Sequence, residues 1–193
     1  GLTEESYHIE LEASLTQDDG YIAMGLNAQK GMGPAPVVAC FKPGSTMADE
    51  KQVSMFWNTA TKSNSPLANS TLAISNGLVS FSDGKLSCSF DLLAVFDVTD
   101  PTDATGVMHL DLNYQAYHLL LAKGTPTKDG KLTYHNSRVS SDQIIQLYDY
   151  GKVQPPSDIY KGCNDSKGCF GLTQGCIANK SCSMVVTYAG LTE

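Results

Sequence analysis

Tyr7-His-Ile-Glu-Leu-Glu-Ala-Ser-Leu15 alternates apolar with polar residues, and this pattern predicts a strand with one buried face. Short runs of strand-like sequence recur along the chain, at residues 21–26, 37–41, 72–74, 78–81, 85–90, 108–114, 117–122, 131–135, 144–148 and 182–188. Asp83-Gly84 and Asp129-Gly130 mark tight turns between neighbouring runs. No segment shows a long helical period. These features predict an all-β fold, an antiparallel β-sandwich.

The composition limits the classes of partner. A length of 193 residues suits one domain, and 41% hydrophobic residues suffice for a globular core. The net charge of −7 argues against a nucleic acid or an anionic membrane as partner, because either would select a basic surface. No apolar run reaches the length of a membrane span, and no signal peptide opens the sequence. If the protein is secreted, we therefore expect this segment to be mature or internal.

Six cysteines, an even number, indicate a disulfide framework and an oxidising compartment. Four of them crowd into a stretch rich in Gly, Asn and Lys, namely Cys163, Cys169, Cys176 and Cys182. Three Asn-x-Ser/Thr sequons predict N-glycosylation at Asn69, Asn164 and Asn179. We therefore expect a secreted, extracellular glycoprotein.

Cys40 and Cys88 lie on two predicted strands, and we expect them to form a disulfide across the sandwich. The four clustered cysteines allow three pairings. Of these, Cys163–Cys176 with Cys169–Cys182, or a nested arrangement, would each tie down a loop that has little core. Zinc is a weaker alternative, because the spacing Cys-x5-Cys-x6-Cys-x5-Cys lacks the short Cys-x2-4-Cys of structural zinc sites.

The first four residues, Gly1-Leu-Thr-Glu4, are identical to the last four, Gly190-Leu-Thr-Glu193. Superimposing the two tetrapeptides places residues 182–188 and 7–15 on either side of a short Gly-containing loop, which is the signature of a hairpin. Tyr150-Gly-Lys-Val-Gln-Pro-Pro-Ser157 is the best linker candidate, since it holds adjacent prolines and a glycine. We therefore expect residues 1–149 to form the main part of the sandwich and 150–157 a linker. Residues 158–193 are then a cystine-rich segment with the first strand of the same or the next unit.

This rotated order predicts one period of a tandem array, or a unit that polymerises through its ends. In a covalent array, the loop belongs to one continuous polypeptide. In a non-covalent polymer, the cystine-rich segment and its strand are donated to a neighbouring copy. A short cloned overlap without assembly is the simpler alternative. The expected partners are copies of the chain itself.

Read from residue 158 through the join, the chain resembles a DOMON domain of the ferric-reductase-like and reeler-associated group. The order and spacing of several landmarks carry the resemblance: residues 163–176, residues 182–188, Tyr21-Ile-Ala-Met-Gly-Leu26, Met32-Gly33 with Val37-Val-Ala-Cys40, Gly84-Lys-Leu-Ser-Cys88-Ser-Phe90, and Tyr117-His-Leu-Leu-Leu-Ala122 leading to Tyr134-His135. It covers most of the chain outside the linker and residues 45–72. The resemblance implies a sandwich of immunoglobulin-like architecture that binds haem, a sugar, or neither.

Haem-binding members of this family hold haem b between a methionine in the loop before the Val-Val-x-Cys strand and a downstream histidine. The matching positions are Met32 and His135, which the resemblance implies as axial ligands of the iron. A thioether and a neutral imidazole make a six-coordinate haem suited to electron transfer. His118 and Met108 are possible substitutes, but each has a simpler packing role in an alternating strand.

The chain departs from the family directly after the Met-Gly pair. Members often carry acidic residues there, whereas this chain has Pro34-Ala35-Pro36. The prolines either stiffen the loop that presents Met32 or mark a domain that has lost haem. No Cys-x-x-Cys-His motif is present, so covalent attachment of the haem is not expected.

No hydrolase motif is found in the sequence, and we expect a binding protein rather than an enzyme. The leading hypothesis is an extracellular haem b-binding repeat of a filament-forming protein that serves electron transfer or haem display. One alternative is a purely structural, glycosylated and disulfide-stabilised repeat without a cofactor. Another is a carbohydrate-binding module, whose aromatic platform would come from Trp57 and scattered tyrosines.

Overall fold

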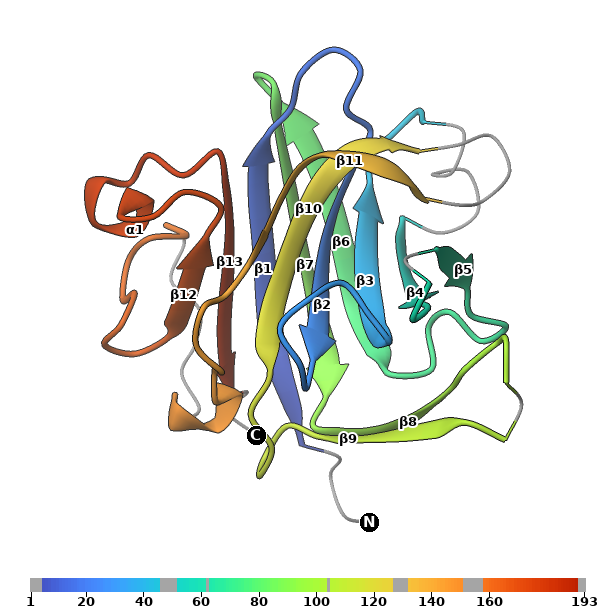
Figure 1. The fold of residues 1–193 in the computed structure, drawn as a ribbon. Helices are drawn as coiled ribbons and strands as arrows, with labels where there is room; N and C mark the ends of the chain where they lie inside the picture. The colour runs from blue at the N-terminus through green and yellow to red at the C-terminus, as the bar shows by residue number, and fades with distance from the viewer. Residues whose placement is uncertain are drawn as a thin grey trace.

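Two antiparallel sheets form a sandwich in the computed structural model, which describes residues 5–45, 52–61, 63–103, 105–126, 132–150 and 158–190 (Figure 1). The first sheet has the order β12 (Gly168–Gly171), β13 (Met184–Gly190), β1 (Ser6–Ser14), β7 (Lys85–Leu93) and β6 (Ile74–Ser82). The second sheet has the order β11 (Leu132–Ser140), β10 (His118–Pro126), β2 (Tyr21–Asn27), β3 (Ala35–Phe41), β4 (Val53–Asn58) and β5 (Asn64–Pro66). A ribbon at one end of the sandwich consists of β8 (Val95–Thr99) and β9 (Val107–Asp111). The predicted all-β class and antiparallel sandwich are confirmed.

The apolar residues whose alternation predicted β1 also fill the core between the sheets. Ile9 and Leu11 are buried, and Ile22 of β2 belongs to the same buried cluster from the opposite sheet. Each such side chain, fully buried, contributes about 1.5–3 kcal/mol through removal from water. The predicted disulfide Cys40–Cys88 is present, with an S–S distance of 2.03 Å, and joins β3 to β7. The two sheets are thus linked covalently as well as by packing.

Some strands differ from the sequence predictions. Every residue of β4 is buried, so this strand has no polar face and shows no alternation that sequence analysis could detect. The strand predicted at residues 144–148 is wrong, because this segment makes a single bridge, Tyr117–Ile145, and then turns into the 3-10 helix η1 (Leu147–Asp149). Ile145 exchanges both of its backbone hydrogen bonds with Tyr117 before the chain turns away from the sheet. The runs 72–74 and 78–81 contribute to one irregular strand, β6.

The cystine-rich segment holds two local disulfides, Cys163–Cys169 and Cys176–Cys182. The overlapping and nested pairings named from the sequence are therefore wrong, and the four sulfurs are not available for zinc. Each disulfide closes a short turn next to β12 or the helical turn α1 (Cys176–Asn179), with a sequence separation of 6 residues. A Cβ on Gly171 would lie 2.4 Å from the Cys176 sulfur, so glycine is needed where this disulfide packs on β12.

The strand pair predicted from the repeated tetrapeptide is present. β13 runs antiparallel to β1, and their register pairs Tyr7 with Gly190 and Ala13 with Met184. Tyr150 packs edge-on against Tyr188, with 5.6 Å between the ring centroids. The described parts of residues 1–150 and the segment 158–190 thus share one sandwich. Residues 1–4 and 191–193 of the repeat, and residues 151–157 of the predicted linker, lie outside the described residues.

The disulfides and the exposed sequons indicate the kind of environment in which the protein folds. Three intramolecular disulfides indicate an oxidising environment. The three sequon asparagines are exposed and therefore accessible to a glycosylating enzyme: Asn69, Asn164 and Asn179. Within the described ranges, no helix is both long and apolar enough to cross a membrane.

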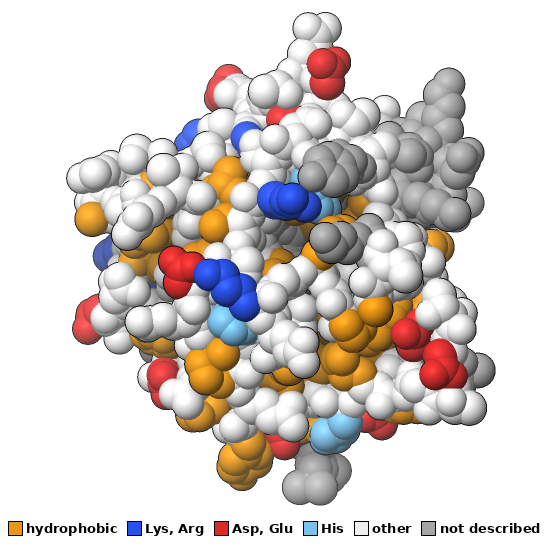
Figure 2. All heavy atoms as spheres, in the orientation of Figure 1, with side chains coloured by type: hydrophobic (Ala, Val, Ile, Leu, Met, Phe, Trp, Pro, Cys, Tyr) orange, Lys and Arg blue, Asp and Glu red, His pale blue; other side chains and the backbone are white. Residues whose placement is uncertain are grey.

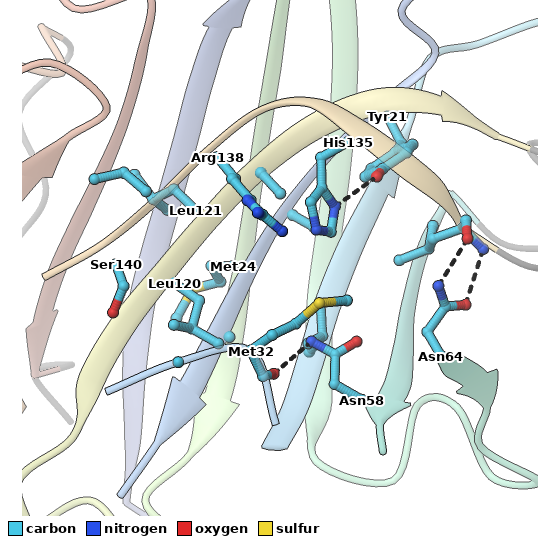
Figure 3. A pocket seen from close by; sticks show the side chains of 17 residues that line it. Tyr21, Met24, Met32, Asn58, Asn64, Leu120, Leu121, His135, Arg138 and Ser140 are labelled. Atoms are coloured by element: carbon cyan, nitrogen blue, oxygen red, sulfur yellow. Dashed lines mark hydrogen bonds between the residues drawn. The ribbon is translucent and has the colours of Figure 1, made fainter. Parts of the chain in front are cut away.

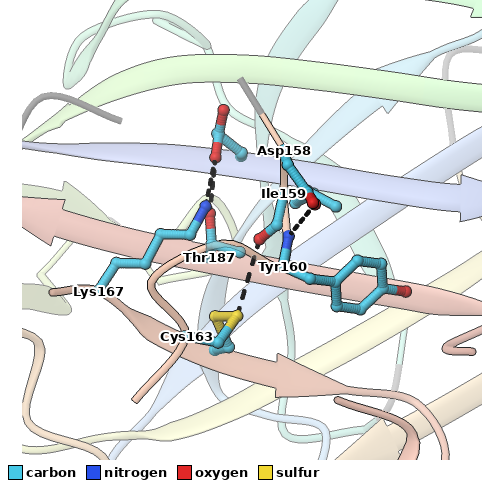
Figure 4. Close-up of polar contacts among 8 residues, drawn as sticks. Asp158, Ile159, Tyr160, Cys163, Lys167 and Thr187 are labelled. Carbon is cyan, nitrogen blue, oxygen red and sulfur yellow. Dashed lines mark hydrogen bonds and ion pairs between the residues drawn. A yellow bond between two sulfur atoms is a disulfide. The ribbon is translucent and has the colours of Figure 1, made fainter. Parts of the chain in front are cut away.

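A buried ion pair fastens the cystine-rich segment to β1. The Lys167 side chain is only 3% exposed, and its Nζ lies 3.2 Å from Oε2 of Glu10 (Figure 4). The Thr187 hydroxyl donates a hydrogen bond of 2.9 Å to the same carboxylate oxygen. A buried ammonium that loses its carboxylate keeps its desolvation cost without compensation.

We expect Glu10→Gln to lower the free energy of unfolding by about 2 kcal/mol, since it removes a charge-assisted hydrogen bond to a buried group. Urea denaturation followed by fluorescence measures this change. Glu12→Gln is the matched control on the same strand face, because its partner Lys85 is 56% exposed and such pairs contribute less than about 1 kcal/mol. Equal losses in the two variants would contradict this account of Lys167.

Candidate functional site

A cavity of about 380 Å³ lies on the outer face of the second sheet, between β2, β10, β11 and the loop that follows β2. In β2, Ile22 and Met24 belong to the core between the sheets, whereas Tyr21 and Ala23 lie in a second buried cluster on the outer side. Small residues of β2 and β10, among them Gly25 and Ala122, line the cavity floor. A Cβ on Gly25 would lie 3.2 Å from side-chain atoms of both Leu120 and Val37, so these two apolar side chains cover the backbone at this point.

Met32 lies on the loop between β2 and β3, and three contacts hold this loop. The Asn58 side-chain amide donates a hydrogen bond of 2.9 Å to the carbonyl of Met32, and Asn27 donates one of 2.8 Å to the carbonyl of Gly31. A Cβ on Gly33 would lie 2.7 Å from the carbonyl oxygen of Thr59, so only glycine allows the loop to approach the end of β4 this closely. The Met32 side chain is thus presented to the cavity from a fastened loop (Figure 3).

His135 reaches the cavity because β11 contains a bulge. The register pairs Lys123 with Ser137 but Gly124 with His135, which leaves Asn136 as an extra residue. Residues three apart on a regular strand face opposite sides, so His135 and Arg138 would not share a face without this insertion. With it, both line the cavity.

The bulge is held by a buried carboxylate. Asn136 donates a hydrogen bond of 2.7 Å to Asp19 Oδ1, while the backbone and hydroxyl of Thr16 donate to Asp19 Oδ2. Burial raises the pKa of Asp19, but these hydrogen bonds outweigh it, and the net shift is below the usual value. The ionised carboxylate therefore stabilises the bulge at neutral pH.

The surroundings of His135 favour a neutral ring with one defined proton position. Burial lowers the pKa of His135, and the positive charge of Arg138 lowers it further. Tyr21 donates its hydroxyl proton to the carbonyl of Thr133 at 3.1 Å, and its oxygen lies 3.4 Å from Nδ1 of His135. This arrangement favours a proton on Nδ1, which leaves Nε2 as the ring atom that carries a lone pair.

Met32 and His135 approach the cavity from opposite sides and point toward one another (Figure 3). The two residues that the resemblance implies as ligands, 103 positions apart by number (135 − 32), are thus brought to one site. A thioether and a neutral imidazole are both suitable donors for haem iron. Among the described residues, no group of three or more His, Cys, Asp or Glu side chains could hold a metal ion without such a cofactor.

The polar residues around this pair were not predicted from the sequence. Asn64 holds the start of β11 through two hydrogen bonds to the backbone of Leu132. Its side-chain amide donates to the Leu132 carbonyl at 2.7 Å and accepts from the Leu132 backbone N–H at 3.0 Å. Arg138 lies beside His135 in the cavity lining (Figure 3). The face of the molecule seen in Figure 2 carries two groups of basic side chains near its centre, each beside a histidine. No sequence signal marks Arg138, because its spacing from His135 predicts the opposite face.

The alternative ligands named from the sequence lie elsewhere. His118 is outside the cavity lining, and its Nδ1 is 2.9 Å from the carbonyl oxygen of Ser141. Met108 belongs to β9, on the separate ribbon. Trp57 is 2% exposed, so it cannot form the platform that a carbohydrate-binding module needs.

Comparisons with protein-family models, with curated proteins and with solved structures gave no match to this chain.

The depressed pKa of His135 makes the stability of the ligand-free protein depend on pH. In the unfolded chain the imidazole has a pKa of about 6.5 and takes up a proton more readily than in the folded protein. Stability is therefore lost as the pH falls below about 6.5 toward the lower folded-state pKa. We expect His135→Gln to show a smaller decline in urea midpoint between pH 7 and pH 5 than the unaltered protein. The same decline in both proteins would contradict a neutral, desolvated His135.

Proposed function

We propose that this protein binds one haem b in the cavity between Met32 and His135 and transfers electrons or displays haem outside the cell. The observation that carries this proposal is the opposed placement of the two side chains across a cavity (Figure 3). A volume of about 380 Å³ falls in the range usual for cofactor and ligand pockets. When bound, haem supplies one-electron redox chemistry.

The residues present fit this group. The depressed pKa keeps the His135 imidazole neutral and able to coordinate, and Tyr21 orients the ring through Nδ1. Arg138 in the cavity lining offers a cation of the kind that pairs with carboxylates such as the haem propionates. If Met32 and His135 both ligated the haem iron, no free position would remain for oxygen, and the bound haem would be suited to electron transfer or display.

We further propose that the unit repeats along a secreted filament, with other copies of the chain as its partners. The disulfides and the exposed sequons support an extracellular setting. The repeated tetrapeptide and the β1–β13 register support the repeat. A purely structural repeat without a cofactor is the second candidate. The repeated tetrapeptide and the β1–β13 register favour a repeat whether or not the cavity holds a ligand. The redox partner is not specified by these observations.

Titration of the purified protein with hemin tests the haem proposal. We expect saturation at one hemin per chain and a sharp Soret band typical of a six-coordinate iron. Iron-free protoporphyrin is the matched control, since it fills the same volume but cannot be ligated. Equal affinity for the two compounds, or no saturable binding of hemin, would favour the structural repeat.

A further inference from the structure

A second cavity lies between the β8–β9 ribbon and the segment that joins β5 to β6 (Figure 1). Its volume is about 270 Å³, and it shares no lining residue with the cavity between Met32 and His135. The wall is mainly apolar and comes from three parts of the chain: Met55, Leu67, Leu72, Phe96, Val98 and Pro101. The proposed haem site makes no use of this cavity.

The floor of this cavity is buried, whereas its rim reaches the solvent. Met55, Phe96 and Val98 are 2%, 7% and 4% exposed. Leu72, on the rim, is 57% exposed. Apolar surface that stays open to water carries a free-energy cost, and such surface often marks a place where another group binds.

Asn69 lies on the same rim and begins the sequon Asn69-Ser70-Thr71. The backbone of this turn is held in place, since the Met55 N–H donates to the Ser70 carbonyl at 2.8 Å and the Ile74 N–H donates to the Thr71 carbonyl at 3.1 Å. Asn69 and Thr71 are themselves exposed. The turn therefore presents an accessible sequon for N-linked glycosylation.

The first sugar of an N-linked glycan has the chemistry that this cavity offers. It is N-acetylglucosamine, whose C–H groups and acetamide methyl are apolar and whose hydroxyls form hydrogen bonds. The apolar wall suits the first set of groups, and Asp97 and Thr99, the polar lining residues of β8, suit the second. Pockets that enclose drug-sized ligands measure roughly 300–1,000 Å³, so this smaller cavity suits a single sugar ring.

The other two sequon asparagines have no such neighbour. Asn164 lies between Cys163 and Cys169, within a turn that their disulfide closes, and Asn179 is the last residue of α1. Neither of them lines this cavity. A glycan at Asn69 is thus placed differently from glycans at the other two sequons.

We infer that the glycan on Asn69 is a structural part of the domain. Its innermost N-acetylglucosamine covers the apolar cavity and joins the turn at residues 67–73 to the β8–β9 ribbon. The oligosaccharide is transferred from a lipid-linked oligosaccharide diphosphate. The bond from sugar C1 to the diphosphate breaks, the bond from C1 to Asn69 Nδ2 forms, the amide loses one proton, and the lipid diphosphate leaves with the bonding electrons. This inference requires the secreted setting of the proposed function and is independent of haem.

Secretion of the full chain from eukaryotic cells tests this inference, with glycan occupancy read from the masses of proteolytic glycopeptides. Asn69→Gln and Thr71→Ala each remove the sequon through a different exposed side chain. Asn179→Gln and Ser181→Ala are the matched controls at a sequon outside the cavity. Each protein is compared by its urea midpoint and by the fluorescence of the dye ANS, which reports exposed apolar surface. A sample of the unaltered protein is also trimmed with an endoglycosidase that leaves one N-acetylglucosamine on each glycosylated asparagine.

We expect Asn69 to be glycosylated in the secreted protein. Asn69→Gln and Thr71→Ala should both bind more ANS and unfold at a lower urea concentration than the unaltered protein, whereas the two control variants should match it. The trimmed protein should match it as well, because the innermost sugar is retained.

An unmodified Asn69 would overturn the inference, and so would an unchanged midpoint and ANS fluorescence in Asn69→Gln and Thr71→Ala. A trimmed protein that behaves like these two variants would also overturn it, because the outer sugars would then be responsible. Dimerisation of the Asn69→Gln protein without a rise in ANS fluorescence would assign the cavity to a second copy of the chain instead. Hemin binding is measured separately on the same proteins, so failure of the haem proposal leaves these outcomes unaffected.

Discussion

In the proposed haem complex, replacement of either Met32 or His135 by alanine is expected to convert a six-coordinate iron into a five-coordinate one. The two side chains face each other across the cavity, and Met24, the other methionine among the described lining residues, is buried in the core between the sheets. His135→Ala should weaken hemin binding by more than about tenfold. Mutation of a residue that only supports a metal ligand already lowers metal affinity by about tenfold or more, and His135 would be the ligand itself. Visible absorption and hemin titration measure both effects.

Met32→Ala should act mainly on the reduction potential. A thioether ligand raises the potential of haem iron, so its removal lowers the potential. We expect a fall on the order of 100 mV, within the span of about 0.8 V that axial ligands cover. His118→Ala and Met108→Ala are the matched controls, because these residues lie outside the cavity lining. A six-coordinate spectrum retained in both cavity variants would contradict the assignment of the ligands.

Loss of the disulfide between the sheets is expected to have the largest effect on stability. Cys40 and Cys88 are separated by 48 residues, and closing a loop of this length restricts the unfolded chain by about 4 kcal/mol. The double variant Cys40→Ala/Cys88→Ala should therefore melt roughly 10 °C lower, given about 2–4 °C per kcal/mol for a domain of this size. Differential scanning calorimetry measures the shift.

The double variant Cys163→Ala/Cys169→Ala is the internal comparison. The two cysteines of this disulfide have a sequence separation of 6, and the same chain-entropy relation gives a stabilisation of about 2 kcal/mol. The loss should accordingly be about half of that for the disulfide between the sheets. A larger loss from the short loop would show that local strain or packing, and not chain entropy, determines the contribution of these disulfides.

The sequence alone predicts the fold class because alternation is visible wherever one strand face meets the core. In β1, apolar Ile9 and Leu11 alternate with Glu10 and Glu12, and the strand lies where it was predicted. β4 escapes detection because it is buried on both faces. The pairing of the clustered cysteines also escapes, since each disulfide depends on a local turn whose geometry the spacing does not specify.

The candidate site, too, could be predicted from the sequence only in part. Met32 and His135 are named by resemblance alone, and the structure brings them to one cavity. Arg138 could not be assigned, because the bulge at Asn136 changes the face on which it lies. Tyr21 is part of a predicted strand, but its contact with His135 joins residues 114 apart in the chain. Such long-range contacts depend on sheet order, which a single sequence does not specify.

The visible absorption spectrum of the protein as isolated, oxidised and then reduced with dithionite, is the decisive measurement for haem binding. We expect a sharp Soret band and, on reduction, resolved α and β bands from a six-coordinate haem b held by Met32 and His135. A featureless spectrum from material shown not to have lost a cofactor would contradict haem binding and leave a structural filament repeat.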